Sequence, residues 1–227
     1  MDVWRVLRDA SPLLFQGLGT TVLVAVAAIL LGIAVGFCVC LLGRSAHRPL
    51  RALAAVYVWV VRGTPMIVQA FIVYFGVPQL VQLAVPGFRI GVLEASIVTL
   101  TFNAGAYLAE IFRGGIQAVD KGQVEAARSL GMSSSRTMYR IVLPQALRIA
   151  APSMVNQFII TVKDTSILSV IGLADLVNKA KVYVGSSYEF FATYVLVALF
   201  YLVLISVLMV VSNSVERRFG DGAQDRR

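Results

Sequence analysis

Five stretches of this 227-residue sequence contain no charged side chain, and their lengths constrain the fold more than any other feature. They are Ser11–Gly43, Gly63–Phe88, Ala95–Ala109, Ile149–Val162 and Phe190–Val215. A helix that crosses the hydrocarbon core of a membrane needs about 20 mostly apolar residues, so three of the stretches are long enough unaided. The third becomes long enough if Glu94 and Glu110 lie at its ends, and the fourth if Lys163 and Asp164 lie within the outer half of the membrane.

These lengths predict an all-α integral membrane protein with five transmembrane helices. The composition agrees, with a mean hydropathy of +0.80 and only 14% charged residues. The first apolar run exceeds the roughly 7 to 15 residues of a signal-peptide core and is followed by no cleavage site, so we expect it to remain as a helix. The expected spans are 13–43, 65–84, 91–112, 145–168 and 190–212, followed by a disordered tail over 220–227.

The 20 Lys and Arg residues outnumber the 12 acidic residues, but they are dispersed between the apolar runs. Nucleic acid is therefore not an indicated partner, because no polar segment gathers the charge. The distribution of the basic residues is better explained by the tendency of membrane proteins to keep Lys and Arg on the cytoplasmic side. With the N-terminus outside and the C-terminus in the cytoplasm, Arg62 and Lys163 belong to neither side and only five basic residues lie outside, namely Arg5, Arg8, Arg89, Lys179 and Lys181.

The most informative polar segment is the predicted cytoplasmic loop over 122–135. It contains Glu125-Ala126-Ala127-Arg128-Ser129-Leu130-Gly131 and is followed by Ile141-Val142-Leu143-Pro144. We expect a short helix over 123–130 that Gly131 ends, and an N-cap for the next helix among residues 133–135. The small side chains of Ala126 and Ala127 would let a groove of another protein close around this helix, while Glu125 and Arg128 could pair at its rim. The alternative is an ordinary amphipathic connector.

This segment resembles the permease subunits of bacterial ATP-binding-cassette importers. Their cytoplasmic loop has Glu-Ala-Ala, three residues, Gly, nine residues, Ile, one residue and Leu-Pro, and the sequence has each fixed position. The resemblance implies a type I importer permease fold in the bacterial inner (plasma) membrane. It also implies that the short helix is a coupling helix that docks on an ATPase subunit through Glu125, Ala126, Ala127, Arg128, Leu130 and Gly131.

Further segments are similar to the polar amino-acid group of these permeases, with glutamine, cystine and histidine permeases as the nearest types. They are Arg62-Gly63-Thr64-Pro65, Asn103-Ala104-Gly105-Ala106-Tyr107-Leu108-Ala109-Glu110, Arg113-Gly114-Gly115 and Lys163-Asp164-Thr165-Ser166. The resemblance implies a second permease copy or homologue, two ATPase subunits and an extracytoplasmic solute-binding protein. Whether the second permease is identical stays open, as does which amino acid is carried.

The sequence contains no phosphate-binding loop, because none of its four lysines follows a glycine. We therefore expect no cofactor in this chain, with ATP and Mg²⁺ bound by the partner ATPase. No metal site is expected either, since the only histidine is His47 and no His/Glu or Ser/His constellation is present. This argues against an intramembrane enzyme. The absence of a duplicated half argues against an ion-coupled carrier, and the polar residues within the spans argue against a purely structural anchor.

Polar side chains within the spans are the candidates for a solute path, because they are costly in hydrocarbon unless they face a cavity or a partner. The candidates are Gln69, Asn103, Tyr107, Asn156, Thr161, Asp164 and Ser166. Asp164 could meet the ammonium of an amino acid, and the amides could meet its carboxylate. Alternatively, Asp164 caps a helix through Thr165 and the asparagines link neighbouring helices.

One acidic residue in this region is expected to have a local partner instead. Glu110 and Arg113 are three residues apart, the spacing at which side chains on a helix are neighbours. We expect these two residues to form an ion pair at the inner membrane edge, and we do not expect Glu110 to contact solute.

Overall fold

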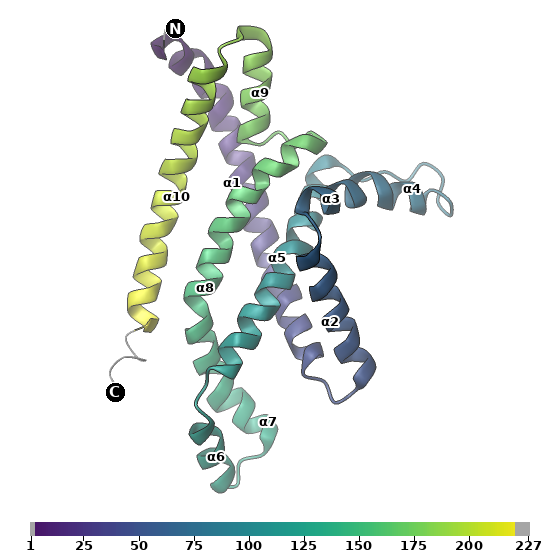
Figure 1. Cartoon of the computed structure of the whole chain (residues 1–227), viewed down its shortest axis with the longest axis vertical. Coiled ribbons are helices and arrows are strands. Elements are labelled where there is room, and N and C mark those ends of the chain that lie inside the picture. Colours follow the sequence, from purple (N-terminus) through teal and green to yellow (C-terminus); the bar gives the residue numbers. More distant parts are fainter. Residues whose placement is uncertain (1–2, 221–227) are drawn as a thin grey trace.

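The computed structural model describes residues 3–220, and every regular element within that range is a helix (Figure 1). The elements are α1 (Val3–Gly43), α2 (Arg48–Gly63), α3 (Met66–Phe71), η1 (Ile72–Gly76), α4 (Val77–Val81), α5 (Val92–Gln117), α6 (Lys121–Ser129), α7 (Ser134–Thr137), η2 (Met138–Val142), α8 (Leu143–Asp164), η3 (Thr165–Ile171), α9 (Leu176–Ser187) and α10 (Phe190–Gly220).

Helix α5 is the centre of the bundle. It packs against α1 and crosses α8, and 61% of its most apolar stretch is buried, against 11% for α10. Helix α10 therefore lies at the edge of the bundle (Figure 1). Its exposed Leu202, Val203 and Val210 side chains suit contact with lipid.

The close approach of α1 to α5 depends on Gly36. A Cβ atom at this position would lie 2.7 Å from Leu108 Cβ and 2.8 Å from the carbonyl oxygen of Gly105. In membrane helices, association relies on such close packing of small residues, because lipid is as apolar as the side chains it replaces. The Gly-x-x-x-Gly pattern of Gly32 and Gly36 thus lies on the face of α1 that contacts α5.

Helix α2 and the segment α3–η1–α4 form a pair that is bent by 109°. As the sequence predicts, a new helix begins at Pro65, which is the N-cap of α3. The hydroxyl of Tyr57 donates a hydrogen bond of 2.6 Å to the carbonyl oxygen of Phe102, which holds α2 on α5. Beyond the bend, α3 and α4 lead away from the bundle (Figure 1).

Within residues 3–220, four helical segments are each long and apolar enough to span a membrane, and the bent pair would make five if it forms one span. Helix α1 begins at Val3 instead of near residue 13. The segment expected over 65–84 is the outer part of the bent pair, which also includes α2. Residues 221–227 of the expected tail lie outside the described range, and residue 220 is the last of α10.

Two π-helical turns each end shortly before a proline. Segment η1 precedes Pro78, and η2 precedes Pro144, the proline of the cytoplasmic pattern. A proline ring clashes with the carbonyl four residues earlier and lacks an N–H to satisfy it. The wider π turn accommodates the ring without ending the helical path.

The connector before α10 contains a helix that the sequence analysis did not predict. Helix α9 lies between the expected spans 145–168 and 190–212, and Asp175 caps its N-terminus by accepting hydrogen bonds from Val177 N at 3.2 Å and Asn178 N at 3.0 Å. The hydroxyl of Thr21 on α1 accepts a 3.2 Å hydrogen bond from Leu176 N. Helix α9 is therefore docked on α1 and is part of the folded structure.

Candidate functional site

The first candidate site is helix α6, at the end of the molecule opposite α9 (Figure 1). The side chain of Asp120 caps the helix by accepting a 2.6 Å hydrogen bond from Gly122 N. Gly131, at φ +81°, ends it, with hydrogen bonds from Gly131 N to Arg128 O at 3.0 Å and from Met132 N to Ala127 O at 3.1 Å. This paired pattern is a Schellman motif, in which glycine adopts the left-handed conformation without a Cβ penalty.

Helix α6 presents most of its predicted coupling residues to solvent. Ala127 faces the body of the protein and is 5% exposed, whereas Glu125, Ala126 and Arg128 are exposed and Leu130 is 85% exposed. An apolar side chain this exposed beside small residues is a suitable contact for a partner protein.

The predicted pair of Glu125 and Arg128 is wrong, since no such ion pair is present within residues 3–220. Arg128 Nη1 instead donates a 2.7 Å hydrogen bond to the carbonyl oxygen of Met132. The guanidinium is drawn to this carbonyl because the end of a helix leaves backbone oxygens unsatisfied. The predicted cap of the next helix is confirmed, as Ser133 Oγ accepts a 3.3 Å hydrogen bond from Arg136 N at the start of α7.

The second candidate site is a row of polar side chains along one face of α5. The row consists of Asn103, Tyr107, Glu110, Arg113 and Gln117, which are spaced by three or four residues and so share a face. Its partners come from the bend between α2 and α3. The amide of Gln69 links the two, since Asn103 Nδ2 donates to Gln69 Oε1 at 2.9 Å.

Gln69 also fixes the bend itself. Its Nε2 atom donates to the carbonyl oxygen of Val61 at 2.7 Å and to that of Thr64 at 3.1 Å, and it contacts the Thr64 hydroxyl at 2.9 Å. These carbonyls lie where the helical ladder is interrupted, so the amide satisfies acceptors that would otherwise be unpaired. Gln69 and Asn103 therefore join two helices as well as occupying the predicted path.

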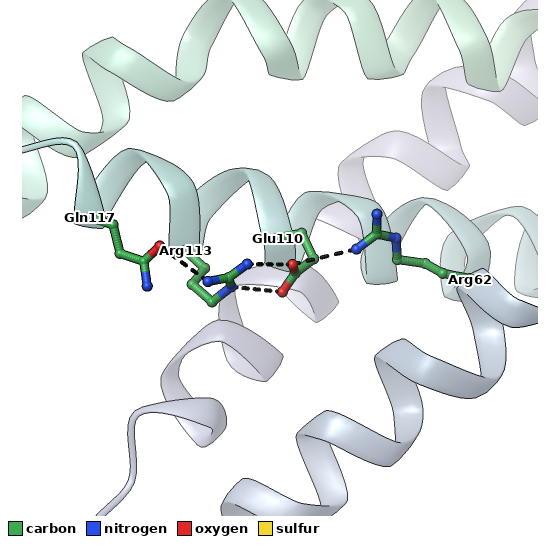
Figure 2. A network of polar contacts seen from close by, with 4 residues as sticks. All are labelled: Arg62, Glu110, Arg113 and Gln117. Carbon is green, nitrogen blue, oxygen red and sulfur yellow. Dashed lines mark hydrogen bonds and ion pairs between the residues drawn. The ribbon is translucent and has the colours of Figure 1, made fainter.

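Arg62, the last charged residue before the bend, extends this row (Figure 2). Its Nη1 atom lies 3.4 Å from Glu110 Oε2, and its Cζ atom lies 5.4 Å from the centre of the Tyr107 ring. Glu110 accepts two hydrogen bonds from Arg113, at 2.9 Å from Nε and 2.7 Å from Nη2, so the predicted pair is confirmed. Arg113 Nη1 continues the network to Gln117 Oε1 at 3.1 Å.

The row continues into a cavity on the side of the bend nearer α6. The cavity lies between α1, α2 and α5, has a volume of about 460 Å³, and is lined by Arg51, Trp59, Glu110 and Arg113 among others. Its volume exceeds that of a single amino acid, and its charged groups come from both α2 and α5. Together, the row and the cavity provide polar contacts along α5.

The remaining predicted path residues lie near the end of α8. Thr161 is buried and its hydroxyl donates to Gln157 O at 2.9 Å, while Ser166 Oγ donates to Lys163 O at 2.7 Å. Asp164 is half-buried, and its side chain accepts no hydrogen bond within residues 3–220, so the alternative of a cap on η3 is wrong. Asn156 is exposed on the same helix.

No hydrogen bond within the described residues joins this group on α8 to the row on α5. The two regions are instead connected by an apolar cluster that includes Ala70, Leu100 and Leu168. The structure thus brings Gln69, Asn103 and Tyr107 together and leaves Asn156, Asp164 and Ser166 on a separate helix end.

Arg62 and Gln117 are members of the row that the sequence analysis did not include. Gln117 could have been found from its spacing, because it follows Arg113 by four residues on the same helix face. Arg62 is in a different helix, and its place beside Tyr107 depends on how α2 packs on α5, which the spacing of residues in the sequence does not give.

Apolar helices with an internal polar row and an exposed small-residue helix at one end define a membrane permease subunit. Residues 28–221 match the family model of the binding-protein-dependent transport system inner membrane component. The chain belongs to this family and is a multi-pass component of the inner membrane. The predicted resemblance to importer permeases is therefore confirmed.

Curated relatives match along nearly the whole length. The chain is 37% identical over 207 residues to the arginine transport system permease protein ArtQ of Bacillus subtilis, covering 91% of this chain and 92% of that protein. It is 35% identical over 219 residues to the glutamine transport system permease protein GlnP of Escherichia coli, covering 95% and 96%.

Solved structures agree with the fold. The chain matches a crystal structure of an amino acid ABC transporter with histidines at a TM-score of 0.90 and 36% identity, covering 96% of this chain and 99% of that one. An inward-facing form of the MetNI methionine ABC transporter matches at a TM-score of 0.74 and 20% identity, covering 91% and 96%, which supports the fold alone. The predicted all-α type I importer permease fold is thus confirmed.

Proposed function

We propose that this chain forms the translocation path of an ATP-driven importer for a polar amino acid. The relatives named for arginine and glutamine transport, at 37% and 35% identity, support this class of substrate. The row on α5 supplies the amide of Asn103, linked to that of Gln69, and such amides can meet the carboxylate of a zwitterionic solute. The path residues are Gln69, Asn103, Tyr107, Asn156, Thr161, Asp164 and Ser166.

The observation that carries the proposal is the exposure of helix α6. Helix α6 packs Ala127 against the body of the protein but leaves Glu125, Ala126 and Arg128 exposed, and Leu130, beside its left-handed glycine end, is 85% exposed. We propose that the helix inserts into a groove of a cytoplasmic ATPase, which binds ATP and Mg²⁺. Closure of two ATPase subunits would then move α6 and, through the helices attached to it, reorient the path.

This arrangement assigns an orientation to the chain. If α6 lies in the cytoplasm, the opposite end of the bundle, with the beginning of α1 and helix α9, lies outside, and α10 ends on the cytoplasmic side (Figure 1). The sequence predicts the same orientation from its basic residues. An extracytoplasmic solute-binding protein would deliver the amino acid to the outer end.

A second permease, either a copy of this chain or a homologue, completes the proposed path. The row on α5 is only partly covered by this chain, since the side chains of Arg62 and Arg113 are 45% and 49% exposed. Charged groups are costly when they face lipid, so another protein surface is expected to cover them. Two permeases and two ATPase subunits would form the membrane complex.

The docking of α6 can be tested by comparing Leu130→Asp with Leu83→Asp. Both leucines are 85% exposed, but Leu83 lies beyond α4. We expect Leu130→Asp to reduce co-purification of the ATPase and to lower ATP-dependent amino-acid uptake in proteoliposomes, because a charge replaces an apolar contact. Leu83→Asp should retain the ATPase. Equal ATPase retention by the two variants would contradict the docking of α6.

A further inference from the structure

A second cavity lies beside helix α6, at the Gln117 end of the polar row on α5. It has a volume of about 440 Å³ and is bounded by the end of α1, the end of α5, α6 and the α7–η2 segment. Its polar lining consists of Arg44, Gln117, Lys121, Arg128, Ser134 and Thr137. The remaining lining is apolar and includes Val119 and Val142, which are buried.

The charge of this cavity is positive. Three of its lining residues, Arg44, Lys121 and Arg128, are cationic, and none is acidic. Within residues 3–220, these three side chains form no ion pair with a carboxylate. Arg128 uses one N–H for the carbonyl oxygen of Met132, which leaves other donors of its guanidinium available.

Thr137 also lines the cavity, but it is 2% exposed and its Oγ1 atom is enclosed by the wall. The donors that the cavity offers to an oxyanion with several acceptor atoms are therefore its three cations.

We propose that this cavity binds a phosphate group, carried either by an anionic phospholipid or by a free phosphate ion. The apolar part of the lining favours the lipid, because an acyl chain could cover the half-buried Val124 and Met138 while the headgroup meets the cations. The position agrees, since Arg44 directly follows the last residue of the first span. Basic pockets between helices at the cytoplasmic side of a membrane are known to suit anionic headgroups.

Occupation of this cavity would affect the orientation of α6. Lys121 and Arg128 belong to α6, whereas Arg44 follows α1. A phosphate that contacts all three would connect the predicted coupling helix to the transmembrane helices. Bound lipid would therefore hold α6 in place before the ATPase docks.

The proposal can be tested on the purified full-length chain in detergent by native mass spectrometry. The probes are phosphatidylglycerol, the zwitterionic phosphatidylcholine and inorganic phosphate, each added at the same concentration. The variant Arg44→Gln/Lys121→Gln should reduce retention of phosphatidylglycerol at least about tenfold, the effect of losing about 1.4 kcal/mol of binding free energy. The control Arg140→Gln removes a charge from the same cytoplasmic segment but outside the cavity lining, and it should retain the lipid.

Retention of phosphatidylglycerol supports a lipid source, and retention of inorganic phosphate alone supports a soluble source. Equal retention of phosphatidylcholine and phosphatidylglycerol would overturn the proposal. So would unchanged binding in the double variant, or no binding of any probe, which would leave an acidic segment of a partner protein as the candidate occupant.

This test does not depend on the proposed transport function. Lipid retention is measured without an ATPase, a binding protein or a substrate. Failure of the lipid test would leave the docking of α6 and amino-acid uptake unaffected, and failure of the Leu130 comparison would leave the lipid result unaffected.

Discussion

Arg62 at the end of α2 lies 3.4 Å from Glu110 in the middle of α5, and this ion pair connects the bent helix pair to the centre of the bundle (Figure 2). The residues are far apart in sequence, and each also has a second partner. Arg62 lies over the ring of Tyr107, and Glu110 is held by two hydrogen bonds from Arg113. Any movement of α2 against α5 must therefore break or rearrange this network.

The first prediction concerns Arg62→Gln. Exposed ion pairs contribute at most about 1 kcal/mol, and a cation–π contact contributes about 0.5 to 1 kcal/mol at an exposed site, so we expect a small loss of unfolding free energy. Uptake should fall more strongly, because the bend loses its charged contact with α5. Thermal unfolding and proteoliposome uptake measure the two effects. Arg48→Gln removes a charge at the start of the same helix and serves as the control, so equal uptake by both variants would refute a specific role for Arg62.

The second prediction compares Gly36→Ala with Gly19→Ala, both on α1. A Cβ atom at Gly36 would lie 2.7 Å from Leu108 Cβ, whereas no atom lies within 4 Å of one at Gly19. We expect Gly36→Ala to reduce the unfolding free energy by about 1 to 3 kcal/mol, the usual cost of an overpacked contact. Gly19→Ala should be neutral or raise stability by up to about 1 kcal/mol through helix propensity. Melting temperatures that change equally would show that α1 and α5 do not pack this closely.

The third prediction concerns Asp164→Asn. If the carboxylate meets the ammonium of the transported amino acid, its neutralisation should lower uptake at least about tenfold, equivalent to about 1.4 kcal/mol. The isosteric change should leave assembly with the ATPase unchanged, because Asp164 accepts no hydrogen bond within residues 3–220. Lys163→Gln removes the adjacent charge and should preserve uptake. Normal uptake by Asp164→Asn would remove Asp164 from the proposed path.

The fourth prediction concerns Asp175, which lies in the connection between two spans. Burial raises the pKa of this carboxyl from 3.8 to about 6, against the effect of hydrogen bonds from Asn178 N and Val177 N and of the nearby Lys181. The folded state then holds a proton more tightly than the unfolded state. The stabilisation that this bound proton gives the folded state is fully present below about pH 4 and is lost as the pH rises through 6.

Asp175→Asn should remove this pH dependence, because asparagine caps a helix about as well as aspartate and carries no charge. The variant should be more stable than the unmodified chain at pH 8, by up to about 3 kcal/mol for a shift of about two pKa units, and the difference should shrink at pH 5. Melting temperatures in detergent at the two pH values measure this. Asp175→Ala removes the cap as well and should be the least stable of the three at pH 5. A constant difference between the unmodified chain and Asp175→Asn would contradict the assigned pKa.

Features that depend on neighbouring residues could be predicted from the sequence. Gly131 ends α6, Ser133 caps α7, Pro65 begins a new helix, and Glu110 pairs with Arg113, as expected. Each of these contacts spans four residues or fewer, so the sequence contains both partners and their spacing. The helical membrane fold follows for the same reason, because the length of an apolar run is itself a local property.

Local spacing also suggested one contact that does not form. Glu125 and Arg128 are correctly spaced for a pair, but the unsatisfied carbonyl oxygen of Met132 binds the guanidinium instead. The spacing of side chains on a helix takes no account of the backbone oxygens that are left unpaired at its end. Helix α9 was not predicted for a related reason, since its docking depends on Thr21, far away in α1.

The sequence by itself determined a chain of apolar helices with a short glycine-terminated helix on one side of the membrane. Only the tertiary structure decided which polar residues meet. The packing of α2 on α5 brings Arg62 to Tyr107 and Glu110, and Gln69 meets Asn103 beyond the 109° bend, while Asp164 and Asn156 remain on another helix. The physical reason is that helix periodicity fixes the face on which a residue lies, but the angle and separation between helices depend on how whole surfaces pack, as at Gly36.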